Sequence, residues 1–442
     1  MRNVLIVSHS FPPRMSAGVF RILRFLKYLP RNGWQPSLVT ARFWGWALRD
    51  HALNDLVPPG IPICRAASPD LFLPFRALRR IGLGELQERL WAATQCPDHH
   101  IAWVPPACHA GLRAFRRTRF DLLFSSAPPF SGHLIGLWLK RRTRLPWVAD
   151  FRDDWSLNPN RTSHPRCTAR FNGRLERRVL ASATAVTAVS EPMREGLARL
   201  AGEGSDSPRF FTVTNAYDPD MFRPRNCAPD PKKFVISYIG SLDALRTGET
   251  FCAGLEHALA EGVVDRSRLV LSFVSNRFPP CSPVVTSVVA YSGRVPHRKA
   301  IRHMLQSHVL LLLISREQGP AMITAKLFEY LGARRTILAV VPGGSDAAEI
   351  VRQTRSGVVV EPDDVPGIAR AIGELYERWR RGLLSSPLDP QDVARYDGAV
   401  VTRQMARVFD WALTRLPEQD PCGGQVSRPG RRTPQCSGKS GR

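Results

Sequence analysis

The stretch Trp147–Trp155 places several charged side chains directly after an apolar run. These side chains are Asp150, Arg152, Asp153 and Asp154. So much charge at the end of a buried strand costs free energy unless the groups are paired or take part in chemistry. A guanidinium and a carboxylate at such a point could position a substrate or balance charge that develops during a reaction. A structural ion pair of Arg152 with Asp150 or Asp153 is the alternative.

A second group of candidate residues follows the apolar run Val235–Ile239. Gly240 and Ser241 come first, and Arg246 follows a few residues later. Glycine lets a ligand approach the backbone closely, and a guanidinium can bind two phosphate oxygens at once. The pattern is weak by itself and indicates a phosphate site only together with the other loops.

A third group lies in the predicted helix Thr324–Leu331. Lys326 and Glu329 are three residues apart and therefore share one face of this helix. Thr324 can cap the helix, whose first amides would then face a ligand crevice. An exposed Lys–Glu helix pair is the alternative.

The loop Ser8–Gly18, which contains Pro13, precedes a predicted helix whose free amides favour an anion. Of the three glycines of a dinucleotide fingerprint only Gly18 is present, so dinucleotide binding is not indicated. A plain strand-to-helix turn is the alternative.

The elements that must position these loops can be read from the apolar pattern. In the first half of the chain, short apolar runs alternate with helical periodicity, which is typical of parallel sheets. Ligands of open α/β sheets bind beyond the carboxyl ends of the strands, which is where these loops lie. The predicted strands are Val4–Ser8, Ser37–Thr40, Asp121–Ser125, Pro146–Asp150, Ala185–Val189 and Phe211–Thr214, and the predicted helices are Val19–Leu29, Phe130–Arg142, Arg170–Leu180 and one capped by Ser190 with Pro192 in its first turn.

The region Phe43–Pro106 shows no clean period, and no elements are predicted there. Leu71–Leu90 within it is amphipathic. This segment is interpreted as a surface helix pair or, alternatively, as a helix that rests on a membrane.

The second half of the chain repeats the alternation after a linker rich in proline and charge. The predicted strands are Val235–Ile239, Leu269–Val274, Val288–Tyr291, Val309–Ile314, Ile337–Val341 and Gly357–Val360, and the predicted helices are Glu249–Ala260, His297–Gln306, Thr324–Leu331, Asp346–Gln353 and Pro366–Arg380. We therefore predict an amino-terminal domain over residues 1–222, a linker over 223–232, a carboxy-terminal domain over 233–400, a closing helix over 401–416 that returns to the first domain, and a disordered basic tail over 417–442.

The composition is consistent with two domains and limits the classes of partner that the protein is expected to bind. The chain has 442 residues, of which 43% are apolar, which is enough for two hydrophobic cores. The formal net charge of +24 would suggest nucleic acid, anionic lipid or an acidic ligand. Basic clusters such as 140–144 lack the interleaved aromatic residues of single-strand readers, so no nucleic-acid partner is predicted. Peripheral contact with an anionic membrane is one explanation of the positive charge. The other is the base composition of the genome, which can favour arginine codons.

The nine cysteines are scattered singly, without a C-x-x-C pair. This pattern disfavours a disulfide scaffold or a structural zinc site. Neither an export signal nor an apolar run of roughly 18 residues is visible. We therefore expect a cytoplasmic protein that is at most peripheral on the inner face of the cell membrane.

The order and context of these loops resemble glycosyltransferase family 4, whose members have the GT-B fold. The resemblance implies an α/β protein of two Rossmann-like parallel-sheet domains that face each other across a cleft. It extends to about Leu416 and leaves out 43–106 and the tail. Besides the opening strand with its Pro-Pro and glycine, the matching segments are Ser125–Phe130, Asp150–Asp153, Ala188–Ser190, Thr214–Asp218, Tyr238–Ser241, Gly293–His297 and Lys326–Leu331.

The resemblance implies a donor site mainly on the second domain. Glu329 would bind the ribose hydroxyls, and the diphosphate would lie near Gly240, Ser241, Arg246 and Lys326. It also implies retention of anomeric configuration and no obligatory metal or cofactor, because basic groups and helix amides meet the diphosphate charge.

The resemblance also assigns roles across the cleft. The predicted catalytic residues are Arg152, Asp153, Arg246 and Lys326. The predicted acceptor side of the cleft is lined by Pro13, Gly18, Asp150 and Asn215.

The sequence departs from the family pattern in three places. Ala321 stands where the first glutamate of the family's paired-glutamate motif is expected. Arg152 stands in place of a histidine, and Ser241, or the displaced Arg246, stands in place of a basic residue.

The predicted activity is that of a hexosyltransferase of envelope polysaccharide biosynthesis. It would move a sugar from a nucleotide diphosphate donor, with UDP preferred, to a saccharide or lipid-linked saccharide acceptor. A non-hydrolysing nucleotide-sugar epimerase is the first alternative, because it shares the GT-B outline. A catalytically silent partner subunit is the second, suggested by Ala321 and Arg152.

Overall fold

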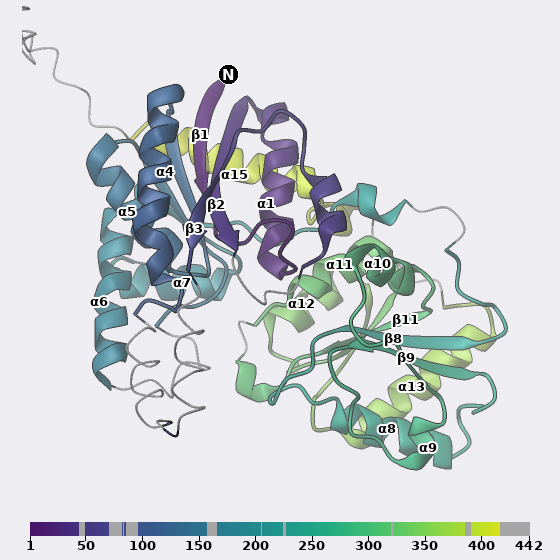
Figure 1. Cartoon of the computed structure of the whole chain (residues 1–442). Helices are drawn as coiled ribbons and strands as arrows, with labels where there is room; N and C mark the ends of the chain where they lie inside the picture. Colours follow the sequence, from purple (N-terminus) through teal and green to yellow (C-terminus); the bar gives the residue numbers. More distant parts are fainter. Residues whose placement is uncertain are drawn as a thin grey trace, which may run out of the picture.

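The computed structural model describes residues 1–43, 49–69, 82, 84, 96–156, 166–204, 206–223, 227–319, 322–384 and 390–415. These residues form two α/β domains, each built around its own parallel sheet (Figure 1). The prediction of two parallel-sheet domains is confirmed. The segments 71–81 and 85–90 of the amphipathic stretch, Ala321 and the tail 417–442 lie outside the described residues.

The first sheet has the strand order β3-β2-β1-β4-β5-β6-β7, with every neighbouring pair parallel. Alternate residues of β1 face opposite layers, as the pleat requires. Val4 and Ile6 pack in an apolar cluster with α1, whereas Leu5 and Val7 pack in a cluster with α4 and α5. The elements are β1 Arg2–Val7, α1 Ala17–Tyr28, β2 Trp34–Phe43, β3 Ile63–Ser68, α4 Val104–Arg117, β4 Leu122–Ala127, α5 Ser131–Thr143, β5 Trp147–Phe151, α6 Arg166–Ser182, β6 Ala185–Ala188, α7 Glu191–Leu200 and β7 Phe210–Thr212.

The second sheet has the order β10-β9-β8-β11-β12-β13 and is also parallel throughout. Ile236 and Tyr238 of β8 pack with α8 and α13 on one face, while Ile239 packs with α10 and α11 on the other. The elements are β8 Phe234–Gly240, α8 Glu249–Ala260, β9 Leu269–Ser275, α9 Pro283–Thr286, β10 Val289–Tyr291, α10 His297–Leu305, β11 Val309–Leu313, α11 Ala325–Ala333, β12 Thr336–Val340, α12 Asp346–Gln353, β13 Gly357–Val360, α13 Val365–Arg380, α14 Pro390–Ala394 and α15 Gly398–Leu413.

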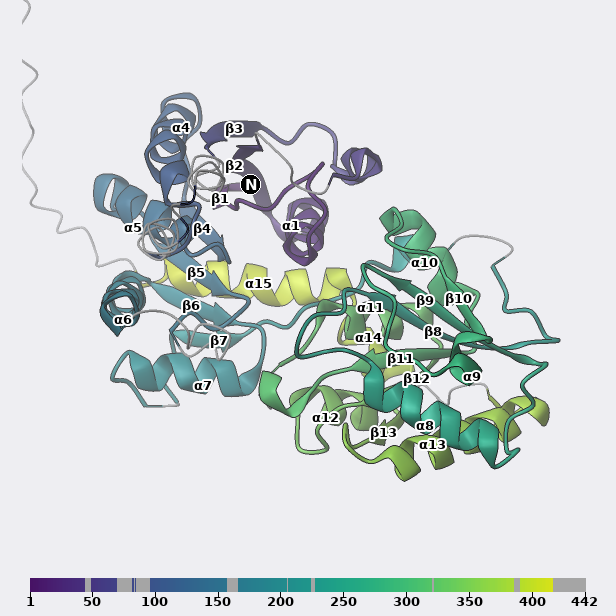
Figure 2. The same ribbon diagram turned by 60° about the horizontal axis from the view of Figure 1, so that its bottom comes forward.

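The chain passes between the domains twice, and the two crossings are hydrogen-bonded to each other. Tyr217 N donates to Tyr396 O at 3.0 Å, and Gly398 N donates to Tyr217 O at 2.8 Å. After the second crossing α15 runs along the first domain beside α1 (Figure 2). The Phe409 ring lies 5.3 Å from the Trp34 ring. The carboxy-terminal helix therefore belongs to the core of the first domain.

The sequence did not predict β3 or α4. β3 lies within the region Phe43–Pro106 and extends the first sheet by pairing with β2, and α4 begins at the end of that region. None of the described helices is both long and apolar enough to cross a membrane.

Candidate functional site

The loops singled out by their chemistry all follow the carboxyl ends of strands. Ser8–Ser16 follows β1, and Arg152 follows β5 in the first sheet. In the second sheet the loop 241–248 follows β8, and the chain from β11 leads into α11. β1 and β8 are each the point where the strand order of their sheet reverses, which is where open α/β sheets bind ligands.

Lys326 lies directly above Gly240 at the end of β8. A Cβ atom built on Gly240 would come within 1.6 Å of Lys326 Nζ, and Gly240 has a φ of 150°. Only glycine therefore fits at this position without displacing the lysine. The ammonium also lies 4.9 Å from the centroid of the Tyr238 ring. The structure thus brings together Gly240 and Lys326, which were both predicted to lie near the donor diphosphate.

Arg246 adds a second cation beside Lys326. Its Nη2 lies 3.4 Å from Asp243 Oδ2, while its buried Nε has no hydrogen-bond partner. Burial, together with the Arg246 charge, lowers the pKa of Lys326 to about 7, although Glu329 and Asp243 oppose the shift. A bound diphosphate would relieve the repulsion between the two cations.

A cavity of about 70 Å³ opens beside Arg246. It is bounded by the loop 245–251 and by the ends of β11 and β12. Ser241 lies at the same edge, and its carbonyl oxygen accepts a hydrogen bond from Tyr238 Oη at 2.8 Å. The predicted donor residues Gly240, Ser241, Arg246 and Lys326 are thus brought together.

Glu329 lies one turn after Lys326 on α11, at the boundary between the domains. His297 Nε2 lies 2.9 Å from Glu329 Oε1, with 8% and 18% of the two side chains exposed. Thr324 occupies the N-cap position of α11 but makes no capping hydrogen bond, contrary to the sequence expectation. Its hydroxyl is buried and has no partner.

Arg152 lies against α1 in the first domain. A Cβ atom on Gly18 would come within 1.9 Å of Arg152 Nη1, so the glycine makes room for the guanidinium. Arg152 Nη2 donates to Pro128 O, and Arg152 Nε is buried without a hydrogen-bond partner. Burial lowers the pKa of Arg152. Arg152, which was predicted as catalytic, and Gly18, which was predicted to line the acceptor side of the cleft, therefore lie side by side.

Asp150 is not available to an acceptor, which corrects the sequence expectation. Its carboxylate is fully buried and pairs with Arg21, with Arg21 Nη2 at 2.7 Å and Arg21 Nε at 3.0 Å. Ser126 Oγ and Thr187 Oγ1 donate to it at 2.7 Å each. Burial alone would raise the pKa of Asp150, but Arg21 and these hydrogen bonds hold it below its usual range. Asp150 therefore stabilises the core of the first domain and pairs with Arg21 rather than with Arg152. The charges of Asp153 and Asp150 oppose the effect of burial on the pKa of Arg152.

The other residues that were predicted for the site in the first domain are Asp153, Asn215 and Pro13. Asp153 is exposed, and burial together with Asp153 raises the pKa of Asp154. Asn215 Oδ1 lies 3.4 Å from Arg21 Nη1, so Asn215 supports the buried pair. Pro13 O accepts a hydrogen bond from Asp50 N at 2.8 Å.

A pocket of about 420 Å³ lies between the domains. The first domain contributes Ser190 and Thr214, at the ends of β6 and β7. The second contributes Asp346 and Glu349 of α12 together with Tyr396. Within the described residues, no group of three or more His, Cys, Asp and Glu side chains could hold a metal ion. A reaction without a metal stays a prediction.

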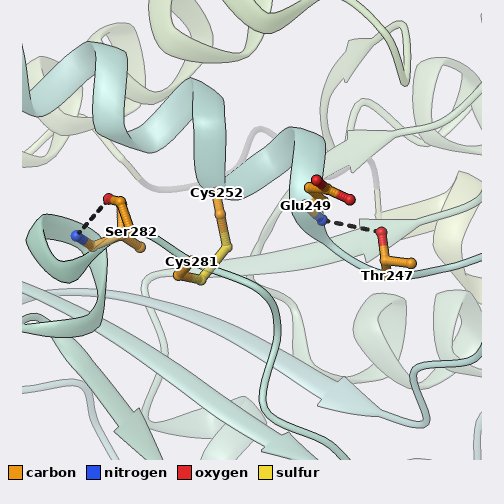
Figure 3. The surroundings of a disulfide bond; sticks show 6 residues. Thr247, Glu249, Cys252, Cys281 and Ser282 are labelled. Atoms are coloured by element: carbon orange, nitrogen blue, oxygen red, sulfur yellow. Dashed lines mark hydrogen bonds between the residues drawn. A yellow bond between two sulfur atoms is a disulfide. The ribbon is translucent and has the colours of Figure 1, made fainter.

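Cys252 of α8 and Cys281, which follows β9, form a disulfide (Figure 3). The spacing of the cysteines disfavoured a disulfide scaffold, and it did not predict this single link across 29 residues. The link lies next to the first turn of α8, where Glu249 N donates to Thr247 Oγ1 at 3.3 Å.

Sequence reasoning missed three residues of this site. No feature of the sequence distinguishes Arg21, apart from its position in a helix that is rich in apolar residues. His297 lies in a segment that matches the family, but the match assigns it no role. Asp50, whose carboxylate accepts from His297 N at 3.0 Å, lies within the region Phe43–Pro106, which has no readable period.

Part of the chain is similar to a known family. Residues 16–215 match the family described as Glycosyl transferase 4-like domain. No curated protein matches the chain.

Similar folds occur among solved structures. Sucrose-phosphate synthase from Thermosynechococcus elongatus has a TM-score of 0.65 at 14% identity, over 94% of this chain and 100% of that chain. Alr3699/HepE from Anabaena, solved with UDP and glucose, has a TM-score of 0.60 at 14% identity, over 93% and 100%. A Listeria monocytogenes protein provisionally named UDP-N-acetylglucosamine 2-epimerase has a TM-score of 0.57 at 9% identity, over 94% and 97%. At these identities the likeness concerns the fold, which is the two-domain GT-B fold.

Proposed function

We propose that this protein transfers a hexose-type sugar from a UDP-linked donor to a saccharide acceptor, with retention of anomeric configuration. The observation that carries the proposal is the pair of cations, Lys326 and Arg246, above the glycine that ends β8. The glycosyl transferase 4-like match over 16–215 supports it. So does the similar fold of the Anabaena protein, which was solved with UDP and glucose.

In this proposal the donor diphosphate lies at the carboxyl edge of the second sheet. Lys326, Arg246 and the first amides of α11 stabilise the negative charge that grows on the leaving diphosphate. Glu329 accepts hydrogen bonds from the ribose hydroxyls. Arg152 and Asp153 of the first domain position the acceptor or balance charge in the transition state. The chemistry needs no metal, because fixed cations and amides supply the positive charge.

The function can be tested with a panel of nucleotide sugars. A ligand at about 100 times its dissociation constant adds about 2.7 kcal/mol to the free energy of unfolding, which is visible as a thermal shift. With the stabilising donor, free nucleotide diphosphate should appear only when a saccharide acceptor is added. Conversion to the epimeric nucleotide-sugar without acceptor, and without net release of free nucleotide diphosphate, would indicate the non-hydrolysing epimerase instead. Binding of donor without turnover on any acceptor would indicate a silent partner subunit.

Affinity for the donor should depend on pH through Lys326. The pKa of Lys326 is lowered to about 7, so the ammonium is charged below that pH and neutral above it. The diphosphate diester of UDP-glucose keeps its charge over this range. We expect the dissociation constant of UDP-glucose to rise about tenfold between about pH 6 and about pH 8 by calorimetry. Lys326→Arg should flatten the profile, and a flat wild-type profile would contradict this role.

We further propose peripheral attachment to the cytoplasmic face of the membrane, where a lipid-linked acceptor could be reached. Exposed arginines gather at the ends of α4 and α5, at Arg116, Arg117, Arg141 and Arg142. None of them makes a salt bridge within the described residues. Lys140 of the same basic run instead donates to Ser182 O.

High salt should release the protein from membranes, because each basic residue near an anionic surface contributes about 1 kcal/mol and is screened by ions. We expect Arg116→Glu/Arg117→Glu to reduce sedimentation with phosphatidylglycerol vesicles about tenfold or more. Arg380→Glu/Arg381→Glu on α13 is the matched control. Protein that stays in the pellet after the salt wash and needs detergent for release would rule out electrostatic attachment.

A further inference from the structure

The Glu329 carboxylate is held from one side only. His297 Nε2 contacts Oε1 at 2.9 Å. Within the described part of the chain, Oε2 has no hydrogen-bond partner. A carboxylate fixed through one oxygen presents the other in a defined direction, so the contact selects one orientation of Glu329 on α11.

His297 is in turn held by the first domain. Its ring lies 4.0 Å from the ring of Phe20 on α1, with 33° between the planes. Its backbone N–H donates to Asp50 Oδ2 at 3.0 Å, and the Asp50 side chain is buried. Asp50 is itself fixed, because Asp50 Oδ1 accepts from Ala52 N at 3.1 Å and Asp50 N donates to Pro13 O at 2.8 Å.

Arg24 adds charge on the same face of α1, one turn after Phe20. It is buried, and burial lowers its pKa to about 10 while Glu329 and Asp218 oppose the shift. Two groups of α1 therefore act on Glu329. Phe20 acts through its contact with His297, and Arg24 acts through its charge.

We propose that His297 is a positioning residue that orients Glu329 for the donor ribose and links occupation of the donor site to α1 of the first domain. This inference rests on the proposed function, in which Glu329 binds ribose. If contact between the domains favours the ribose-binding orientation, then donor binding must favour that contact by the same factor. The Phe20 and Asp50 contacts are the physical route, since both end on His297.

The test measures UDP binding by calorimetry and the hydrogen exchange of residues 17–28 with and without UDP. We expect His297→Ala to weaken UDP binding about tenfold, and His297→Gln, whose amide can still donate to Glu329, to stay within about threefold of the wild type. UDP should slow exchange in α1 of the wild type but not of His297→Ala. His257→Ala, which removes the exposed pair of His257 with Glu261 at 3.1 Å in the same domain, should change neither quantity.

Phe20→Ala separates the two parts of the inference. It leaves the His297–Glu329 contact in place and removes the ring stack, so UDP should bind within about threefold of the wild type while the protection of α1 is lost. Phe20→Ala also tests the link between the donor site and α1 if His297→Ala fails to fold.

UDP affinity in His297→Ala equal to that of the wild type, or α1 protection by UDP in Phe20→Ala equal to that of the wild type, with weakened binding in Glu329→Ala, would overturn the inference and leave the proposed function standing. A wild-type protein that binds neither UDP nor a UDP-sugar would overturn both.

Discussion

Asp150→Ala should lower the free energy of unfolding by about 3–5 kcal/mol, because it leaves the Arg21 guanidinium buried without its counter-charge. Arg21 and Asp150 have 2% and 0% of their side chains exposed, so water cannot replace the lost carboxylate. Ser126 and Thr187 also lose their acceptor. A loss of this size exceeds what an average core substitution costs.

Denaturant unfolding followed by circular dichroism measures this loss. Glu377→Ala is the matched control, because its partners Arg380 and Arg381 are exposed and such pairs contribute less than about 1 kcal/mol. Arg21→Met/Asp150→Ala should recover part of the stability of Asp150→Ala, since the uncompensated charge is gone. If Asp150→Ala were as stable as the control while sugar transfer was lost, the carboxylate would act on the substrate, as the sequence first indicated.

The sheets could be predicted from the sequence because buried parallel strands appear as short apolar runs. Val309–Leu313 is buried at every position, and the same segment was predicted as a strand. The helix after β6 was also predicted correctly. Ser190 caps it, accepting from Met193 N, and Pro192 lies in its first turn, where a missing N–H costs nothing.

β3 and α4 could not be predicted, for reasons specific to each. β3 is a short edge strand that alternates buried Ala66 and Ser68 with exposed Arg65, so it lacks an apolar run. α4 begins with Val104-Pro105-Pro106, and the two prolines resemble a helix break. They are tolerated because they lie in the first turn, before the internal hydrogen bonds of the helix begin.

Some residues of the candidate site could likewise be predicted from the sequence, and others could not. The donor residues could be proposed because the end of β8 with its following loop and the first turns of α11 each carry a chemical signal of their own. The buried pair could not be identified, since Arg21 and Asp150 are 129 positions apart and meet only when α1 packs on the sheet. The contact of His297 with Glu329 likewise depends on α10 packing beside α11.

Glu329→Ala should weaken binding of the donor about ten- to hundredfold, because a hydrogen bond to a charged group contributes roughly 1.5–3 kcal/mol. The loss should be the same for every sugar carried by one nucleotide, since they share the ribose and differ in the sugar. Glu329→Gln should lie between the variant and the wild type, because an amide oxygen still accepts but carries no charge. Titration calorimetry with UDP-glucose and with UDP alone measures each dissociation constant.

Glu261→Ala is the control. Glu261 pairs with His257 at 3.1 Å, as Glu329 pairs with His297, but the Glu261–His257 pair is far more exposed to solvent. Lys326→Ala should differ in kind: donor affinity should fall about tenfold, as loss of the Lys326 charge predicts, and turnover should fall further, because the ammonium also meets charge that develops as the diphosphate leaves. Donor affinity unchanged by Glu329→Ala would place the ribose elsewhere. The cations above Gly240 would then remain a phosphate site without the ribose contact that makes it a nucleotide-sugar site.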